Sequence, residues 1–183
     1  MSVNNFEGKK AMKDSDANSD LELLWKTYDL VKYWLEYGEK KNLALLTIVG
    51  FEMTVLNFFE KQISYKYLKV PFIPLILAFI MALISFYPKT DYLEFLKRTK
   101  LPEDSRALNL VFYGDIQKLS ISSYIEAMEK YNNIRIRDNK PAEDLCSQIV
   151  ILSKIATNKF TLFKTALFLA MLGQFALILL IVL

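Results

Sequence analysis

Residues Thr165–Leu183 read TALFLAMLGQFALILLIVL, a run of 19 residues without a charged side chain. A helix of this length is long enough to cross roughly 30 Å of hydrocarbon. Lysines precede it at Lys154, Lys159 and Lys164, where long cationic side chains can extend among lipid headgroups. This stretch predicts a transmembrane helix over 165–183 and an integral membrane protein.

The composition agrees with this prediction. The 183 residues are 53% hydrophobic and 23% charged, so the two classes must be segregated along the chain. A net charge of +3 with dispersed Lys and Arg argues against nucleic acid as a partner. One cysteine excludes a disulfide within the chain, and the absence of histidine removes the commonest general base and metal ligand.

Two further segments have the character of membrane spans. Val70–Tyr87 is uncharged, and we expect its prolines to fall in the first helical turn. Asn42–Phe59 is a weaker candidate because Glu52 lies near its middle, and the alternative is an amphipathic or core helix that never crosses. If Asn42–Phe59 is a helix, its small and polar side chains share one face, roughly opposite Glu52, that suits close helix packing. These residues are Thr47, Gly50, Thr54 and Asn57.

The segments predict an all-α membrane protein with about three transmembrane helices. A small, mainly helical cytoplasmic domain is inserted between spans two and three. The positive-inside rule places the N-terminus and this domain in the cytoplasm and the C-terminus outside. The expected parts are a mobile leader at 1–20, a cytoplasmic helix at 21–41, a transmembrane hairpin at 42–88, the cytoplasmic domain at 89–164 and the last span at 165–183.

Two long helices are expected from the pattern. Asp20 is a plausible N-cap for a helix over Leu21–Lys41 that continues into the first span. Pro141 fits the start of another helix, and nothing in the sequence interrupts it before Leu183. The second helix would then be roughly 60 Å long.

The segment between the spans shows shorter elements. Asn109–Ile116, NLVFYGDI, is apolar and aromatic, and predicts a strand or extended segment ended by Gly114. Ser123 and Glu126 have capping-box spacing and predict a helix through Tyr131.

Catalytic and metal-binding motifs are missing from the sequence. It has no GxxxxGK[ST] loop, no HExxH and no paired cysteines. Cys146 lies at the edge of a helix and is better explained by packing than by nucleophilic chemistry. We expect neither an enzyme nor a bound cofactor.

Three stretches, in order along the chain, resemble the Pycsar transmembrane effector family of bacterial antiphage defence. They are WLEYGEKKNLALLTIVG (Trp34–Gly50), NLVFYGDIQKLSISSYIEAM (Asn109–Met128) and DLCSQIVILSKIATNKFTLFKTA (Asp144–Ala166). In the first stretch, the small alanine usual after the lysine is replaced by Lys41-Asn42.

The resemblance implies an effector of the bacterial inner membrane. A partner cyclase makes a cyclic pyrimidine mononucleotide such as cUMP or cCMP, and the effector senses it and impairs the membrane. A homo-oligomer is expected because three spans cannot enclose a pore alone.

Such a ligand needs an aromatic face for its base and a cation or N–H groups for its phosphate. The alternatives are packing for each aromatic side chain and headgroup contact for the lysines. The candidate ligand-binding residues are Phe112, Tyr113, Tyr124, Arg135, Gln148, Lys154 and Lys159, and the candidate membrane or pore residues are Glu52, Thr47, Gly50, Thr54 and Asn57.

A second class of function stays open on the sequence. A constitutive membrane scaffold or assembly protein would bind a protein partner through its cytoplasmic helices. Such a protein would bind no nucleotide.

Overall fold

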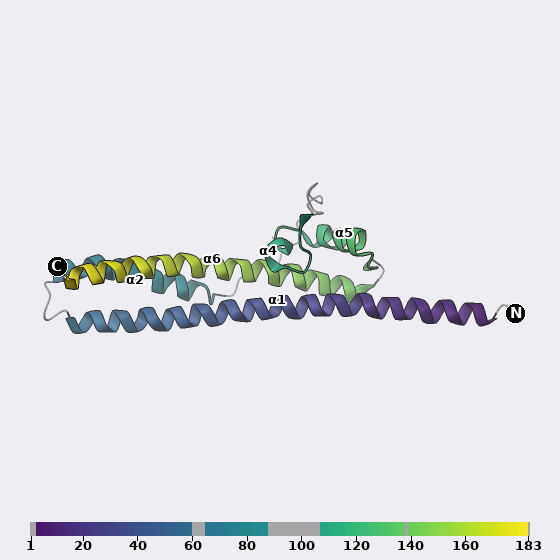
Figure 1. The fold of residues 1–183 in the computed structure, drawn as a ribbon, viewed down its shortest axis with the longest axis horizontal. Helices are drawn as coiled ribbons and strands as arrows, with labels where there is room; N and C mark the ends of the chain where they lie inside the picture. Colours follow the sequence, from purple (N-terminus) through teal and green to yellow (C-terminus); the bar gives the residue numbers. More distant parts are fainter. Residues whose placement is uncertain (1–2, 60–64, 88–106, 138, 183) are drawn as a thin grey trace. The chain divides into compact units, whose positions relative to one another are not determined.

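The protein is all-helical throughout the residues that its computed structural model describes, with no strand in 3–59, 65–87, 107–137 or 139–182. Side chains are described in these ranges apart from 3–19, 59, 65–68 and 181. The helices in chain order (Figure 1) are α1 (Val3–Phe59), α2 (Tyr65–Ile84), α4 (Tyr113–Ile116), α5 (Ile121–Asn132) and α6 (Lys140–Val182).

The chain forms two compact units. Unit 1 comprises Met1–Trp34 and Thr90–Ile155, and unit 2 comprises Leu35–Lys89 and Ala156–Leu183. The helices α1 and α6 contribute residues to both units, while α4 and α5 belong to unit 1 and α2 to unit 2.

The long helices agree with the sequence in their extent. The helix α6 has 43 residues and is continuous, which confirms the prediction of a single helix over 141–183 and gives it a length of about 64 Å. The helix α1 has 57 residues and passes through 21–41 into 42–59 without a break. It begins at Val3, so it includes most of the segment predicted as a separate leader, and Asp20 is not its N-cap.

Unit 1 packs around one apolar core. Leu24 and Val31 of α1 are fully buried in it, together with Tyr124 of α5 and Ile149 of α6. Leu24 and Val31 are seven residues apart, the spacing that returns a side chain to one face of a helix. This core fixes α4 and α5 against the two long helices.

Two local predictions in unit 1 were wrong. Phe112 is extended, but the chain then turns into the short helix α4, so 109–116 is not a strand. The N-cap of α5 is Ser120, whose hydroxyl accepts a hydrogen bond from the backbone N–H of Ser123. Ser123 therefore lies in the first turn, and Ser120, three residues earlier, satisfies the exposed N–H group.

Unit 2 is a bundle of three helices: the later part of α1, the later part of α6, and α2 (Figure 1). Glu39 contacts Lys159, and Glu52 contacts Gln174, so α1 and α6 run parallel. The carbonyl of Ser85 contacts Lys159, while Leu75 lies against Gly173. This order makes α2 antiparallel to α6.

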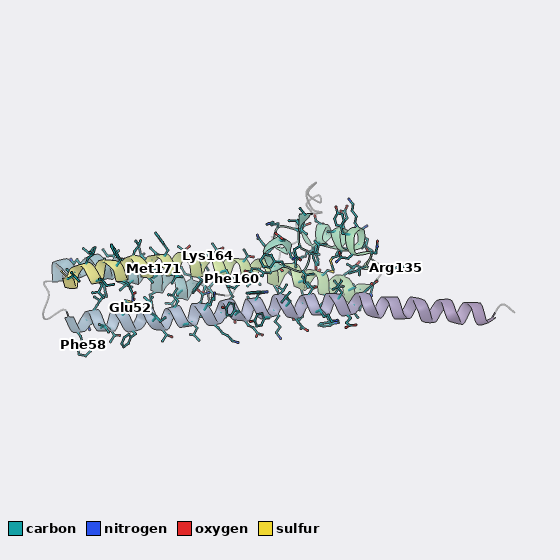
Figure 2. The ribbon with its side chains drawn as sticks, in the orientation of Figure 1. Glu52, Phe58, Arg135, Phe160, Lys164 and Met171 are labelled. Carbon is teal, nitrogen blue, oxygen red and sulfur yellow. The ribbon has the colours of Figure 1, made fainter. Side chains whose placement is uncertain are left out.

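The interior of unit 2 combines four alanines with larger aliphatic side chains, and much of its exterior is apolar. Four alanines are buried between the helices, at Ala78, Ala82, Ala166 and Ala170. Large apolar side chains are exposed instead, among them Phe51, Phe58, Ile73, Phe168, Met171, Phe175 and Ile178. Figure 2 shows Phe58 and Met171 on this exterior. Small residues inside and large apolar residues outside are typical of helices packed in lipid.

One helix among the described residues has the length and composition of a membrane span. It is α6, in which the apolar stretch is only 17% buried, unlike the core helix of a soluble protein. Lys69–Ile84 in α2 is a shorter apolar helix. The predicted positions of Pro71 and Pro74 were wrong, because α2 starts at Tyr65 and both prolines lie inside it.

Gly173 allows α2 and α6 to approach closely. A Cβ atom there would lie 2.7 Å from Leu75 Cγ and 3.1 Å from the carbonyl oxygen of Pro71. We expect Gly173→Ala to lower the free energy of unfolding by about 1–3 kcal/mol, because the contact with the backbone cannot relax easily. Thermal unfolding of the purified full-length protein measures this change.

Gly50 provides the matched control. A Cβ at Gly50 would lie 3.7 Å from the Phe79 ring, an ordinary contact. Gly50→Ala should leave stability unchanged or raise it by up to about 1 kcal/mol, since alanine favours helix. Equal destabilisation by the two substitutions would contradict the packing described for unit 2.

Candidate functional site

Three aromatic side chains form a cluster in unit 1. The rings of Phe112 and Tyr113 have centroids 4.8 Å apart, and the ring of Tyr113 is 5.7 Å from that of Trp34 on α1. Phe112 is 42% exposed, so one ring of the cluster is open to solvent. A Cβ on Gly114 would lie 2.5 Å from the Phe112 ring, so a larger residue there would force this exposed ring to move.

Polar side chains stabilise the turn that presents Phe112. The carboxylate of Asp115 accepts hydrogen bonds from the backbone N–H of Asn109 at 3.1 Å and from Lys118 Nζ at 2.6 Å. These bonds, that of Lys118 first, hold the pKa of Asp115 below its usual value. Asn109 in turn accepts from the backbone N–H of Val111.

Arg135 lies on a connection that carboxylates hold in place. The backbone N–H of Arg135 donates to Asp20 on α1, and those of Ile136 and Arg137 both donate to Glu129 Oε1. Ile136 is fully buried, while the side chain of Arg135 is exposed. Figure 2 shows Arg135 near the N-terminal end of α6.

The candidate ligand-binding residues therefore fall into separate places. Arg135 contacts Asp20 and Tyr113 contacts Trp34, and these two α1 residues are 14 positions apart, or about 21 Å along the helix. One small nucleotide cannot touch both. The exposed aromatic cluster and Arg135 are two surfaces rather than one site.

Three other candidates are placed differently. Tyr124 is fully buried, and its hydroxyl donates to the carbonyl of Leu110. Burial raises the pKa of Tyr124, and also raises the pKa of the neighbouring Cys146 thiol to about 12, which leaves that thiol unreactive. On α6, Gln148 is exposed and Lys154 is half-buried.

Lys159 belongs to unit 2 and connects its three helices. Its ammonium group lies 3.0 Å from Glu39 of α1 and donates to the carbonyl of Ser85, which follows α2, also at 3.0 Å. Its backbone carbonyl accepts from the side chain of Asn42. The Lys159 side chain is only 11% exposed. A cation at the C-terminal end of a helix also stabilises the helix dipole, here that of α2.

Glu52 lies inside unit 2. Its Oε1 accepts a hydrogen bond from Gln174 of α6, while its buried Oε2 has no hydrogen-bond partner among the described residues. Thr47, Thr54 and Asn57 of the same helix are exposed. The two hydroxyl groups donate to the carbonyls of Leu43 and Gly50. Glu52 therefore points into the bundle, while Thr47, Thr54 and Asn57 lie on an exposed face of the same helix. The fourth residue predicted for that face, Gly50, lies near the ring of Phe79.

Sequence reasoning missed the partners of the two buried charges. Gln174 is the one amide within the apolar run 165–183, and its position in that run was the available indication. Glu39 and Asn42 lie at the point where the sequence departs from its resemblance, at Lys41-Asn42. Nothing in the sequence indicates that the carbonyl of Ser85 accepts a hydrogen bond from Lys159.

We expect Lys159→Gln to destabilise the protein by about 2 kcal/mol, since hydrogen bonds to a charged group contribute about this much. In a chain of this size the melting temperature should fall by roughly 4–8 °C. Lys40→Gln, at an exposed position on the same end of unit 2, should change it little. Equal melting temperatures for wild type and Lys159→Gln would mean that the three-helix contact contributes nothing.

Comparison with known proteins gives one assignment. The profile of the family described as the Pycsar effector protein domain, PycTM, matches residues 23–183, well over half of the chain. No protein of curated function and no solved structure matches the chain. The matched region includes all of unit 2 and unit 1 from residue 23 onwards, and the family is one of membrane effectors rather than enzymes. The match supports a role in antiphage defence, and the chain belongs to the Pycsar effector family.

Proposed function

We propose that this protein is a membrane-embedded antiphage effector that senses a cyclic mononucleotide of the cUMP or cCMP type and then impairs the bacterial inner membrane. The observation that supports the membrane part most directly is the exterior of unit 2, where many large apolar side chains are exposed around a core that includes four alanines. Family membership supports the effector role.

The proposed topology has three spans. From Asn42 to Phe58, α1 rises about 24 Å, and from Lys164 the rest of α6 rises a similar distance, close to the hydrocarbon thickness of a bilayer. Lys40, Lys41, Lys159 and Lys164 gather at the end of unit 2 where α1 and α6 lead into unit 1. By the positive-inside rule this end, with the N-terminus and unit 1, faces the cytoplasm.

The aromatic cluster of unit 1 is the proposed place for the base of the nucleotide. Phe112 offers an exposed ring supported by Tyr113 and Trp34, and stacking on aromatic rings is a common way to bind a base. The phosphate then needs a cation, and the proposed cation is Lys154 of α6, a half-buried lysine of unit 1. Arg135 is a poor candidate because it contacts Asp20, which lies about 21 Å from Trp34 along α1.

Coupling to the membrane would use the two long helices. Trp34 is the last residue of unit 1 on α1, and Glu39, which pairs with Lys159, follows five residues later on the same helix. A movement of α1 at Trp34 would therefore reach the Glu39–Lys159 contact directly. We propose that loss of this contact frees the three helices to repack, in an oligomer, into the membrane-damaging form.

A scaffold that binds a protein partner is the alternative function. No contact in the described residues favours it over the effector. It becomes the better explanation if the protein binds no cyclic nucleotide and co-purifies with one stoichiometric partner.

The nucleotide proposal is tested by membrane depolarisation. Cells expressing the protein should depolarise when cUMP or cCMP is supplied, and Phe112→Ala should raise the nucleotide concentration required by roughly tenfold, because a base stack contributes about 1–3 kcal/mol. Calorimetry on the purified protein should show the same loss of affinity.

Trp25→Ala is the matched control for this experiment. Trp25 is an exposed aromatic residue on α1, nine residues or about 14 Å before Trp34. Its replacement should leave the nucleotide response unchanged. Wild-type cells that keep their membrane potential with every cyclic nucleotide would refute the sensing function.

Glu52 tests the role of the membrane unit in the damage. Glu52→Gln retains the size of the side chain and removes a charge that is expensive inside a membrane. The resting bundle should become more stable, so that several-fold more nucleotide is needed for depolarisation. If depolarisation is unchanged, Glu52 has no role in the membrane damage and only packs against Gln174.

A further inference from the structure

Several lysines at one end of unit 2 form no ion pair with any carboxylate of the described residues. Glu39 pairs with Lys159 at 3.0 Å. For Lys40, Lys41 and Lys164, no carboxylate of the described residues lies within ion-pair distance. The far end of α2 has Lys69 as its one cation with a described side chain. Among the side chains of unit 2 that the structure describes, four lysines therefore lie at one end and one at the other.

Aromatic rings fix the position of Lys41. Its Nζ lies 4.7 Å from the ring centroid of Tyr37 on α1 and 5.4 Å from that of Phe163 on α6. Cation–π contacts of this kind hold an ammonium group at a defined place without neutralising its charge. Lys41 thus presents a full positive charge at the border of the apolar bundle.

The next residue of α6 after Phe163 adds a second cation. Lys164 is exposed, and Figure 2 shows it on α6 beyond Phe160. The Phe160 ring lies 6.4 Å from that of Tyr37. From Lys164 onwards α6 has an apolar exterior. Aromatic and basic side chains at the edge of an apolar surface are typical of the level of lipid headgroups.

We propose that this end of unit 2 binds the headgroup of an anionic phospholipid, with Lys41 and Lys164 as the two residues that contact its phosphate. The acyl chains would lie along the exposed apolar side chains beside them, among which are Phe168 and Met171. A zwitterionic lipid offers no net charge to the two ammonium groups, so the site distinguishes lipids by charge. The inference concerns unit 2 alone and does not depend on nucleotide sensing.

Native mass spectrometry tests the proposal on the full-length protein released from bilayers of phosphatidylglycerol and phosphatidylcholine. The wild type should retain phosphatidylglycerol in preference to phosphatidylcholine. Lys41→Gln and Lys164→Gln should each weaken its retention about fivefold, and the double variant about 25-fold, since a basic residue near a membrane surface contributes about 1 kcal/mol. Lys41→Arg, which retains the charge and can retain the cation–π contacts, should keep the preference for the anionic lipid.

Lys69→Gln is the matched control, because it removes one lysine from the other end of the same bundle. Its lipid retention should equal that of the wild type. The proposal is overturned if Lys69→Gln loses as much lipid as Lys41→Gln, or if the wild type shows no preference for the anionic lipid. Displacement of the lipid by an excess of inorganic phosphate would also overturn it, because the site would then accept a free anion.

Discussion

The apolar exterior of unit 2 is the constraint on which the other features depend. Phe51, Phe58, Phe168 and Phe175 are all more than half exposed, and such a surface is stable only when lipid or protein covers it. In lipid, every backbone N–H and C=O group must find its partner inside the protein, so the segments are helical. Association of these helices then relies on close contact, which the buried alanines and Gly173 provide.

The same constraint explains where polar side chains are found in this unit. Glu52 is turned inward and accepts from Gln174, and the hydroxyl groups of Thr47 and Thr54 are used by the carbonyls four residues earlier. At the basic end, Lys159 brings α1, α6 and the end of α2 together. Two buried side-chain oxygens of the described residues, Asn42 Oδ1 and Glu52 Oε2, have no hydrogen-bond partner, and both lie in the bundle that we propose to rearrange.

The features that follow from apolar periodicity could be predicted from the sequence. Prediction failed where a few polar contacts determine the local structure. The apolar run after Lys164 and the unbroken pattern from Pro141 were sufficient for α6, and the pattern over Leu21–Lys41 predicted a helix that continues into the first span, as α1 does. The strand predicted at 109–116 was wrong because Asp115 bonds Asn109 and Lys118 and closes a helical turn, which periodicity does not reveal. Of the candidate site residues, Phe112 and Tyr113 do lie together. The distance of Arg135 from them and the ion pair between Lys159 and Glu39 depend on contacts between residues far apart in the sequence, so the sequence alone did not predict them.

We propose that unit 2 crosses the membrane with three helices while unit 1 stays on the cytoplasmic side. Cysteine accessibility in intact cells tests it most directly, because Cys146 is the one native cysteine and can be replaced by alanine. In this background, Lys118→Cys should react with an impermeant maleimide only after the cells are opened, Ile48→Cys should not react in either case, and Phe58→Cys should react from outside. Reaction of Phe58→Cys only in opened cells would show that α1 does not cross, and would contradict the account.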